Sequence, residues 1–312
     1  MTMFAFVFPG QGSQAVGMLD AWGDQPAVRH TLQEASDALG EDVAALIRNG
    51  PKEQLDLTTN TQPAMLAAGI ACWRAWVEET GLMPCVLAGH SLGEYSALVA
   101  AEALPLADAL PLVRLRAQAM QDAVPVGAGG MAAILGLDAD AVRAGCAEAA
   151  EATGEAVQAV NFNDPKQTVI AGSKAGVDKA CEVLKARGAK RALPLAVSAP
   201  FHSSLMRPAA DRLKEALVTT RLRTPRIPVV NNIDARPESE PERIRDALYR
   251  QAFGPVRWVE VVQAMHALGV THIVECGPGK VLAGMVRRIS PAIVATSVYD
   301  PVSLADARGQ LA

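Results

Sequence analysis

The chain has 312 residues, of which 50% are hydrophobic and 20% are charged, and its formal net charge is -4. This composition supplies ample apolar material for a large core and excludes disorder or a coiled coil as an overall description. The small negative charge, the lack of a long basic block and the 4% aromatic content also argue against nucleic acid or an anionic membrane as a partner.

The termini and the cysteines favour a soluble, cytoplasmic protein. The five cysteines form no CxxC pair, which argues against a zinc site or a redox couple and favours a reducing compartment. The first residues carry no positive charge before Arg29 and do not fit a signal peptide. The longest apolar stretch, residues 97–115, contains acidic residues and prolines, so no membrane span is expected.

Short apolar runs that end in glycine or turn residues predict strands buried on both faces. In chain order these runs are residues 4–8, 85–89, 227–232, 272–276 and 292–298. Long alanine- and leucine-rich segments with helical spacing, such as 62–80 and 258–268, lie between them. The alternation predicts an α/β protein with a parallel sheet covered by helices.

The middle of the chain breaks this alternation and reads βαββαβ, the order of a ferredoxin-like unit. Its predicted elements are strands at 131–137, 156–162, 167–172 and 191–197, with a helix after the first strand and another at 174–187. Glycine-rich residues 126–130 and the turn at 198–201 flank the unit. We therefore predict a discontinuous core, residues 1–125 and 198–312, interrupted by a ferredoxin-like insert at 126–197.

Residues 89–93 read GHSLG and match the G-x-S-x-G nucleophile elbow. The pentad lies between a predicted strand and a helical segment, as the elbow requires, because its glycines allow the tight turn that places the serine at the helix N-terminus. A bare match can also be a structural turn with an inert serine. The surrounding elements favour Ser91 as a nucleophile.

A serine nucleophile needs a base, and the sequence offers five histidines. His202 follows the residues APF in a loop just after the insert, where a rigid X-Pro turn can hold an imidazole at the end of the sheet. We predict it as the base, against the alternative of a solvated loop histidine. The others lie in helical segments, in the elbow or at the start of a strand: His30, His266, His90 and His272.

Arg116 lies on the apolar face of a predicted helix at 110–124, at helical spacing from Leu112 and Met120. A guanidinium on such a face must find an anion, because burying it unpaired is costly. One interpretation is a structural ion pair with an acidic side chain. The other is a bidentate clamp for a substrate carboxylate.

Residues 10–15, GQGSQA, fit a dinucleotide-binding fingerprint after a strand. That fingerprint requires a second strand ending in an acidic residue about 20 positions later. The sequence there is helical, TLQEASDALGEDVAALI. Nicotinamide binding is therefore disfavoured, and the glycine-opened amides could hold an oxyanion instead.

Six features occur in order: FPGQGSQ (8–14), GHSLGE (89–94), Arg116, APFH (199–202), Gln251 in RQAFGPVRW, and ECGPGKVL (275–282). Together they resemble the malonyl-CoA:acyl carrier protein transacylases, the stand-alone acyltransferases of bacterial fatty acid synthesis. The resemblance spans nearly the whole chain. It implies an α/β-hydrolase-like core with a ferredoxin-like insert, in agreement with the predicted element order.

The resemblance also implies a role for each matching residue. Ser91 would attack the malonyl thioester, with His202 as its general base. Arg116 would hold the free malonyl carboxylate. Gln11 and Leu92 would donate backbone N–H groups to the oxyanion.

Three further residues would complete the site. Gln251 would orient the catalytic histidine through a carbonyl acceptor. His90 would line the same pocket. Phe201 resembles the residue of malonyl-selective relatives, whose bulk leaves little room for an α-methyl group; one methyl changes binding by about 1–3 kcal/mol.

The implied reaction is ping-pong: CoA leaves a malonyl-serine ester, which the phosphopantetheine thiol of acyl carrier protein then takes up. The implied partners are malonyl-CoA and an acidic carrier protein, with no cofactor or metal, and a monomer is our default expectation. An acidic partner predicts a basic rim. The candidates are Lys185, Arg187, Lys190, Arg191, Lys280, Arg287 and Arg288.

A serine hydrolase or thioesterase is the alternative, because it would use the same elbow. Hydrolases of this kind place the acid before a C-terminal histidine. That role would fall to His272, which begins a predicted strand rather than a loop. The chain order therefore favours the transferase.

Overall fold

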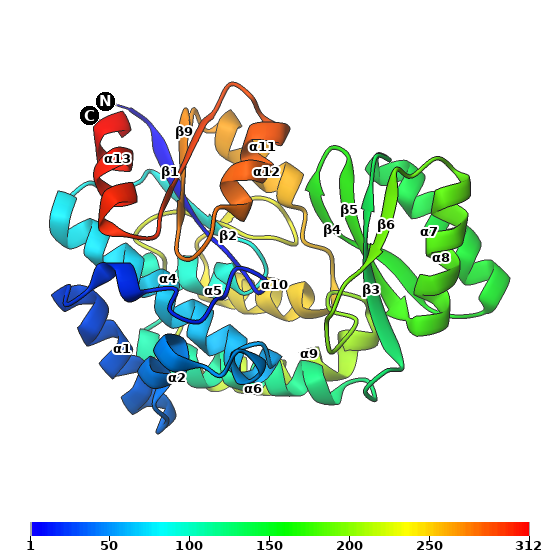
Figure 1. Ribbon diagram of the computed structural model, residues 1–312, viewed down its shortest axis with the longest axis horizontal. Coiled ribbons are helices and arrows are strands. Elements are labelled where there is room, and N and C mark those ends of the chain that lie inside the picture. Colours follow the sequence, from blue (N-terminus) through cyan, green and yellow to red (C-terminus); the bar gives the residue numbers. More distant parts are fainter. Residues whose placement is uncertain (1, 312) are drawn as a thin grey trace.

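The computed structural model describes residues 2–311, which form two β-sheets with helices packed against them (Figure 1). The larger sheet contains β1 (Phe4–Phe8), β2 (Val86–Gly89), β7 (Val229–Val230), β8 (Pro237–Glu238), β9 (His272–Cys276) and β10 (Val294–Val298). The smaller sheet contains β3 (Gly129–Leu135), β4 (Val157–Asp164), β5 (Gln167–Ser173) and β6 (Arg191–Pro194).

Helices connect these strands. In chain order they are α1 (Pro26–Leu39), α2 (Val43–Asn49), α3 (Lys52–Leu55), α4 (Thr58–Thr80), α5 (Gly93–Ala100), α6 (Leu106–Asp122), α7 (Ala139–Thr153), α8 (Lys174–Ala186), α9 (Arg207–Thr219), α10 (Pro241–Phe253), α11 (Trp258–Ala267), α12 (Val281–Ile289) and α13 (Pro301–Leu311). Two short 3-10 turns are η1 (Asp20–Trp22) and η2 (Ser204–Met206). Within residues 2–311, no helix combines the length and the apolar character that crossing a membrane requires.

The larger sheet has the order β10-β9-β1-β2-β7-β8, and its pairs are parallel as far as β7. The phenylalanines of β1 point to one face, against Trp73 and Trp76 of α4. Ala5 and Val7 point to the opposite face, into a cluster with side chains of α11 and α12. Alternate residues of one fully buried strand thus serve two helical layers. The predicted mixed α/β fold with a parallel sheet is confirmed.

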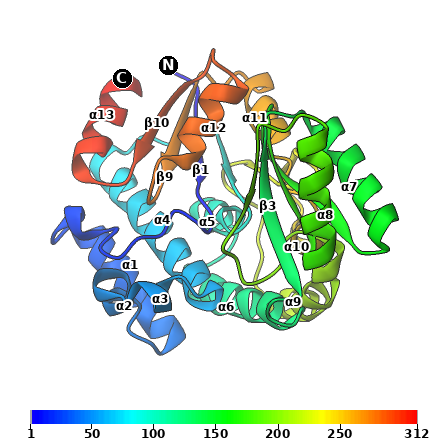
Figure 2. The ribbon, with the colours of Figure 1, turned by 45° about the vertical axis from the view of Figure 1, so that its right-hand side comes forward.

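The smaller sheet has the order β4-β5-β3-β6, and every neighbouring pair is antiparallel. Figure 2 shows α7 and α8 on its outer side, away from the larger sheet. On the inner face, Met131, Val160 and Ala171 pack with Phe201. The element order from β3 to β6 is βαββαβ, as the sequence predicts.

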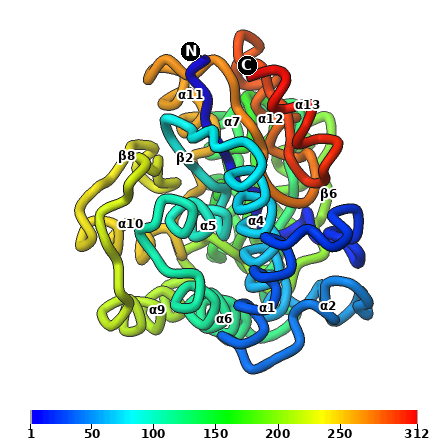
Figure 3. Tube along the Cα trace, turned by 90° about the vertical axis from the view of Figure 1, so that its left-hand side faces the viewer, coloured from blue at the N-terminus to red at the C-terminus, as the bar shows by residue number. Residues whose placement is uncertain are grey.

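Backbone pairing joins the smaller sheet to the segment between α10 and α11. Val256 donates to Val160 O at 2.8 Å and accepts from Phe162 N at 3.0 Å, beside an isolated parallel bridge with Asn161. An ion pair between Arg288 of α12 and Asp164 of β4 adds to this seam. These contacts hold β4 of the smaller sheet against α12 and the segment that leads into α11. The start of β1 and the end of α13 lie side by side (Figure 1 and Figure 3).

Several predicted boundaries are wrong, including these three. Residues 227–232 are predicted as one strand, but only Val229–Val230 pair, because the chain turns at Asn231, whose Oδ1 accepts from Asp234 N at 2.7 Å. Gly129 and Gly130, predicted to precede the first strand of the ferredoxin-like unit, begin β3. The strand predicted at 191–197 ends at Pro194, beyond which the chain runs toward the site.

Candidate active site

Ser91 lies on a sharp turn between β2 and α5, with a left-handed backbone at φ 52°. A Cβ added at Gly89 would lie 1.9 Å from the backbone of Gly93, and one added at Gly93 would lie 2.0 Å from Phe8 O. Both glycines are required because backbone segments meet at these points. The strand, turn and helix context predicted for the nucleophile elbow is confirmed.

The Ser91 hydroxyl lies 2.7 Å from Nε2 of His202. The other ring nitrogen, Nδ1, faces two backbone carbonyls, Gln251 O at 2.9 Å and Gly254 O at 3.2 Å. Because carbonyls only accept, Nδ1 carries the hydrogen and Nε2 is left to accept from the serine. The arrangement can therefore take a proton from Ser91.

His202 is buried, and its surroundings favour the neutral imidazole. Burial, together with the positive charge of Arg116, lowers its pKa to about 3. The two backbone carbonyls oppose this effect without reversing it. At neutral pH the ring is thus unprotonated, which is the form that a general base needs.

Arg116 is buried beside the nucleophile. It donates to Gln62 Oε1 at 2.7 Å, to Gln251 Oε1 at 3.0 Å and to the Ser91 hydroxyl at 3.2 Å. All three acceptors are neutral, and within residues 2–311 no carboxylate forms an ion pair with this guanidinium. The interpretation as a structural ion pair is wrong. A buried cation with neutral partners can take an anion from outside.

Gln251 connects these groups without lining the cavity. Its backbone carbonyl is the acceptor for His202, and its side-chain Oε1 accepts from Arg116. Its Nε2 donates to Ser91 O at 3.0 Å and to Glu94 Oε2 at 3.0 Å. One fully buried residue therefore contacts Ser91, His202 and Arg116.

A cavity of about 130 Å³ opens above Ser91, between the two sheets. Its walls include every predicted site residue except Gln251: Gln11, His90, Ser91, Leu92, Arg116, Phe201 and His202. The remaining walls are Gln62, Met120, Met131, Asn161, Leu195 and Val197. The smaller sheet contributes Met131 and Asn161, so the site depends on both sheets.

The two predicted oxyanion residues flank the nucleophile. Leu92 occupies the N-cap position of α5, where backbone amides point outward from the helix. A Cβ added at Gly10 would lie 2.7 Å from His90 O, so the segment that carries Gln11 passes directly over the elbow. The Gln11 side chain is held by Thr58, whose hydroxyl donates to Oε1 at 2.7 Å.

His90 and Phe201 link the elbow to the smaller sheet. The Nε2 atom of His90 lies 2.8 Å from Asn163 Oδ1, and its ring packs against Trp258. Burial lowers the pKa of His90, partly opposed by Asn163. Phe201 packs on the hydrophobic clusters of both sheets, next to His202.

The structure also bears on the dinucleotide-binding and hydrolase interpretations of the sequence. The segment after β1 leads into η1 and α1, so the second strand of a dinucleotide-binding unit is missing from this part of the structure. His272 contacts Thr271 Oγ1 and is not the partner of Ser91. Within residues 2–311, no group of three or more acidic, histidine or cysteine side chains could hold a metal ion.

Several residues of the predicted basic rim contact other residues of the protein. Arg288 pairs with Asp164 at 2.7 Å, and Arg287 donates to Ala295 O. Arg187 pairs with Glu148, and Lys280 lies over the ring of Tyr299. Arg288 therefore has a structural role that its sequence position does not indicate.

Three residues that contact the predicted site residues are not predicted from the sequence: Gln62, Glu94 and Asn232. Gln62 lies in a helix predicted only from its apolar spacing. Glu94 ends the motif GHSLGE, and this was the one signal that could have drawn attention to it. Asn232 lies in the region predicted as a continuous strand, which hid its side chain's contact with the elbow.

Comparisons with known proteins agree with this geometry. Residues 5–295 match the family described as acyl transferase domain. The malonyl CoA-acyl carrier protein transacylase of Salmonella typhimurium is 51% identical over 311 residues, covering 99% of this chain and 100% of that protein. The corresponding protein of Bacillus subtilis is 45% identical over 305 residues, covering 97% and 96%.

Solved structures give the same result. The acyl-carrier-protein S-malonyltransferase of Burkholderia pseudomallei has a TM-score of 0.97 and 63% identity, covering 99% of this chain and 100% of that chain. A malonyl-transacylase in complex with a type II PKS acyl-carrier protein has a TM-score of 0.97 and 49% identity, with the same coverage. The chain therefore belongs to the acyl transferase domain family and, within it, to the malonyl CoA-acyl carrier protein transacylases.

Proposed function

We propose that the protein transfers the malonyl group of malonyl-CoA to the phosphopantetheine thiol of an acyl carrier protein, through an ester on Ser91, and so supplies fatty acid synthesis. One observation carries this proposal. The buried guanidinium of Arg116 lies 3.2 Å from the Ser91 hydroxyl, and its hydrogen-bond acceptors are all neutral. An acyl group that ends in a carboxylate supplies an anion in direct contact with this guanidinium, whereas an acetyl group does not.

In the first half-reaction, Ser91 Oγ bonds to the thioester carbon while its proton passes to Nε2 of His202. Backbone N–H groups of Gln11 and Leu92 stabilise the oxyanion. The carbon–sulfur bond breaks, and the CoA sulfur takes the proton from His202. The carrier-protein thiol then attacks the ester by the same steps in reverse, so the proton count balances.

The orientation of His202 suits this exchange. Its Nδ1 donates to neutral carbonyls rather than to the carboxylate of a serine protease triad. The imidazolium is therefore stabilised less than it would be by a carboxylate. This weaker stabilisation is sufficient for the transfer, because thiolates are good leaving groups. The cavity is small and lined by apolar side chains such as Met120 and Val197. This favours a dry ester intermediate over hydrolysis.

The same proposal includes a division of the chain. Residues 1–125 and 198–312 form an α/β-hydrolase-like core, and residues 126–197 form a ferredoxin-like insert. The antiparallel order β4-β5-β3-β6 and the βαββαβ succession support it. Phe201, between the two, restricts the space for an α-methyl group. The enzyme is proposed to act in the cytoplasm as a monomer.

A panel of acyl-CoA substrates tests the function. Malonyl-, methylmalonyl-, succinyl- and acetyl-CoA are each mixed with the enzyme, with and without phosphopantetheinylated carrier protein. We expect malonyl transfer to the carrier protein to be fastest, with little free malonate when the carrier protein is left out. Rapid release of free acid without the carrier protein would support the thioesterase alternative instead.

A further inference from the structure

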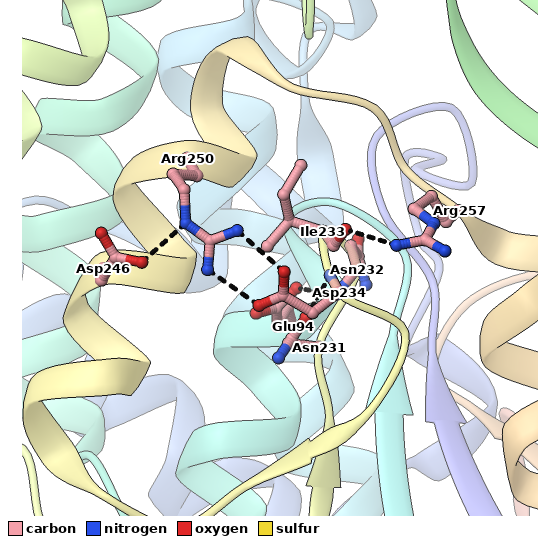
Figure 4. Close-up of polar contacts among 8 residues, drawn as sticks. All are labelled: Glu94, Asn231, Asn232, Ile233, Asp234, Asp246, Arg250 and Arg257. Atoms are coloured by element: carbon pink, nitrogen blue, oxygen red, sulfur yellow. Dashed lines mark hydrogen bonds and ion pairs between the residues drawn. The ribbon is translucent and has the colours of Figure 1, made fainter.

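The site contains a buried carboxylate to which the proposed reaction assigns no role. Glu94 lies in the first turn of α5, three residues after the nucleophile, and is 2% exposed. Its Oε2 accepts from the backbone N–H of Asn232 at 2.8 Å and from Nε2 of Gln251 at 3.0 Å. Figure 4 shows it facing the loop of residues 231–234.

Asn232 connects this carboxylate to the elbow. Its Oδ1 accepts from Ser91 N at 2.7 Å, and its Nδ2 donates to Gly89 O at 2.6 Å. The side chain therefore bridges two points of the turn that carries the nucleophile. Left-handed backbone at a non-glycine residue persists only where the surroundings hold it. Glu94 holds the backbone of Asn232, and Asn232 in turn holds Ser91.

Gln251 connects the same carboxylate to Arg116. A carboxylate can only accept, and a guanidinium can only donate. Glu94 therefore requires the NH₂ end of the Gln251 amide on its side, which turns Oε1 toward Arg116. Without this acceptor, the amide could rotate and present its NH₂ group to the guanidinium.

A second contact, nearer the surface, joins the segment that contains Asn232 to the segment that contains Gln251 (Figure 4). Arg250, the neighbour of Gln251, donates to both oxygens of Asp234 at 2.8 Å and to Asp246 at 2.6 Å. The segments that contain Asn232 and Gln251 are thus joined twice. Arg250 and Asp234 join them near the surface, and Glu94 joins them in the interior.

The charges around Glu94 match a counter-ion role. Arg116 approaches from α6, Asp234 from the loop after β7, and Tyr95 from α5 itself. Burial raises the pKa of Glu94 to about 7, opposed by its two N–H donors and by Arg116. A malonyl carboxylate on Arg116 adds a second negative charge on the far side of Gln251. Two carboxylates near one cation disfavour each other's ionised form.

We propose that Glu94 is a positioning residue of the transacylase site: it fixes the elbow through Asn232 and the Gln251 amide directly, and its negative charge balances Arg116 until a malonyl carboxylate arrives. This inference rests on the proposed function, because it takes the malonyl carboxylate as the ligand of Arg116. It follows that the charge of Glu94 weakens malonyl binding, while its hydrogen bonds support catalysis on any acyl group.

Two variants separate these effects. Glu94→Gln keeps an acceptor oxygen and removes the charge. At pH 8 we expect the ratio of kcat/KM for malonyl-CoA to that for acetyl-CoA to rise about tenfold over the wild type, chiefly through the malonyl-CoA KM. Glu94→Asp keeps the charge and withdraws the oxygen by one methylene. We expect it to lower kcat for both substrates about tenfold with their ratio unchanged.

The pH supplies a readout that a merely structural residue would not move. The difference in ratio between Glu94→Gln and the wild type should be small at pH 6, where Glu94 is protonated, and should widen as the pH rises through about 7. Glu275→Gln is the matched control, because Glu275 is also a buried carboxylate and binds Ala283 N at the start of α12. For Glu275→Gln, the ratio of kcat/KM for malonyl-CoA to that for acetyl-CoA should equal the wild-type ratio at each pH.

The outcomes are distinct. An unchanged ratio in Glu94→Gln, or an equal loss with both substrates in both variants, overturns the inference while leaving the function intact. Failure of the wild type itself to transfer malonyl overturns the proposed function. If Glu94→Gln does not fold, the unchanged ratio and lowered kcat expected for Glu94→Asp still test the positioning role.

Discussion

The Ser91 hydroxyl and Nε2 of His202 lie 2.7 Å apart, and both residues have left-handed backbone, with φ of 52° and 64°. Side chains with a Cβ rarely adopt this region, because the Cβ crowds the neighbouring carbonyl. The fold therefore holds both of the proposed catalytic residues in strained backbone. In an elbow, such strain places the nucleophile above the helix N-terminus.

This strain predicts an unusual order of stabilities at position 91. We expect Ser91→Gly to unfold with a free energy about 0.5–1 kcal/mol higher than Ser91→Ala, because glycine adopts positive φ without strain. Ser96, in the following helix, is the matched control: Ser96→Gly should be about 1 kcal/mol less stable than Ser96→Ala. Denaturant unfolding measures both pairs. The same sign at both positions would contradict the strain.

Arg116→Ala should lower the preference of the enzyme for malonyl-CoA over acetyl-CoA. Loss of charge-assisted hydrogen bonds worth about 1.5–3 kcal/mol lowers kcat/KM for malonyl-CoA about 10- to 100-fold. The acetyl-CoA value should fall less, so acetyl transfer is relatively favoured. Arg114→Ala is the control, because Arg114 pairs with Glu41 near the surface. Parallel losses for the two substrates in Arg116→Ala would refute the clamp.

Glu275 should make stability depend on pH. Burial raises its pKa to about 7, from an ordinary value of 4.5. A raised carboxyl pKa means that the folded protein binds the proton more tightly, so this contribution to stability is full below about pH 4.5 and is lost as the pH rises through about 7. The stability of the wild type relative to Glu275→Gln should therefore fall between pH 5 and 8. Urea unfolding that shows a constant difference would disprove this linkage.

Arg288 should matter for stability. Its partner Asp164 is 7% exposed, so Arg288→Glu leaves a buried carboxylate without its cation and should cost about 1–3 kcal/mol. Arg187→Glu is the comparison, because both partners of the Arg187–Glu148 pair are exposed. That change should cost less than about 1 kcal/mol. Equal losses in denaturant unfolding would show that the seam does not depend on Arg288.

Much of the fold could be predicted because its signals are local. The strands 4–8 and 272–276 match β1 and β9 residue for residue, since continuous apolar runs bounded by turns have few other structures available. The short strands β7 and β8 are harder to predict from the sequence. Polar Asn231 and Asn232 extend an apolar run in sequence, but their side chains bind turn and elbow atoms that only the tertiary structure brings near.

The site divides in the same way. Ser91 and His202 lie in recognisable motifs, and Arg116 can be predicted because it is a cation on an apolar helix face. Their placement around one cavity agrees with that prediction. Glu94 and Gln62 carry weaker signals, because an acid or an amide in a helix is ordinary in sequence. Only the packing of α4, α5, α6 and α10 shows that both belong to the surroundings of Arg116.

Formation and transfer of an ester on Ser91 test the mechanism most directly. The enzyme is mixed with malonyl-CoA, and its intact mass and the modified residue are determined by mass spectrometry, before and after addition of phosphopantetheinylated carrier protein. The mechanism predicts a malonyl adduct on Ser91 that persists in buffer, disappears when the carrier protein is added, and never forms in Ser91→Ala. An adduct on another residue, or malonyl transfer by Ser91→Ala at the wild-type rate, would contradict it.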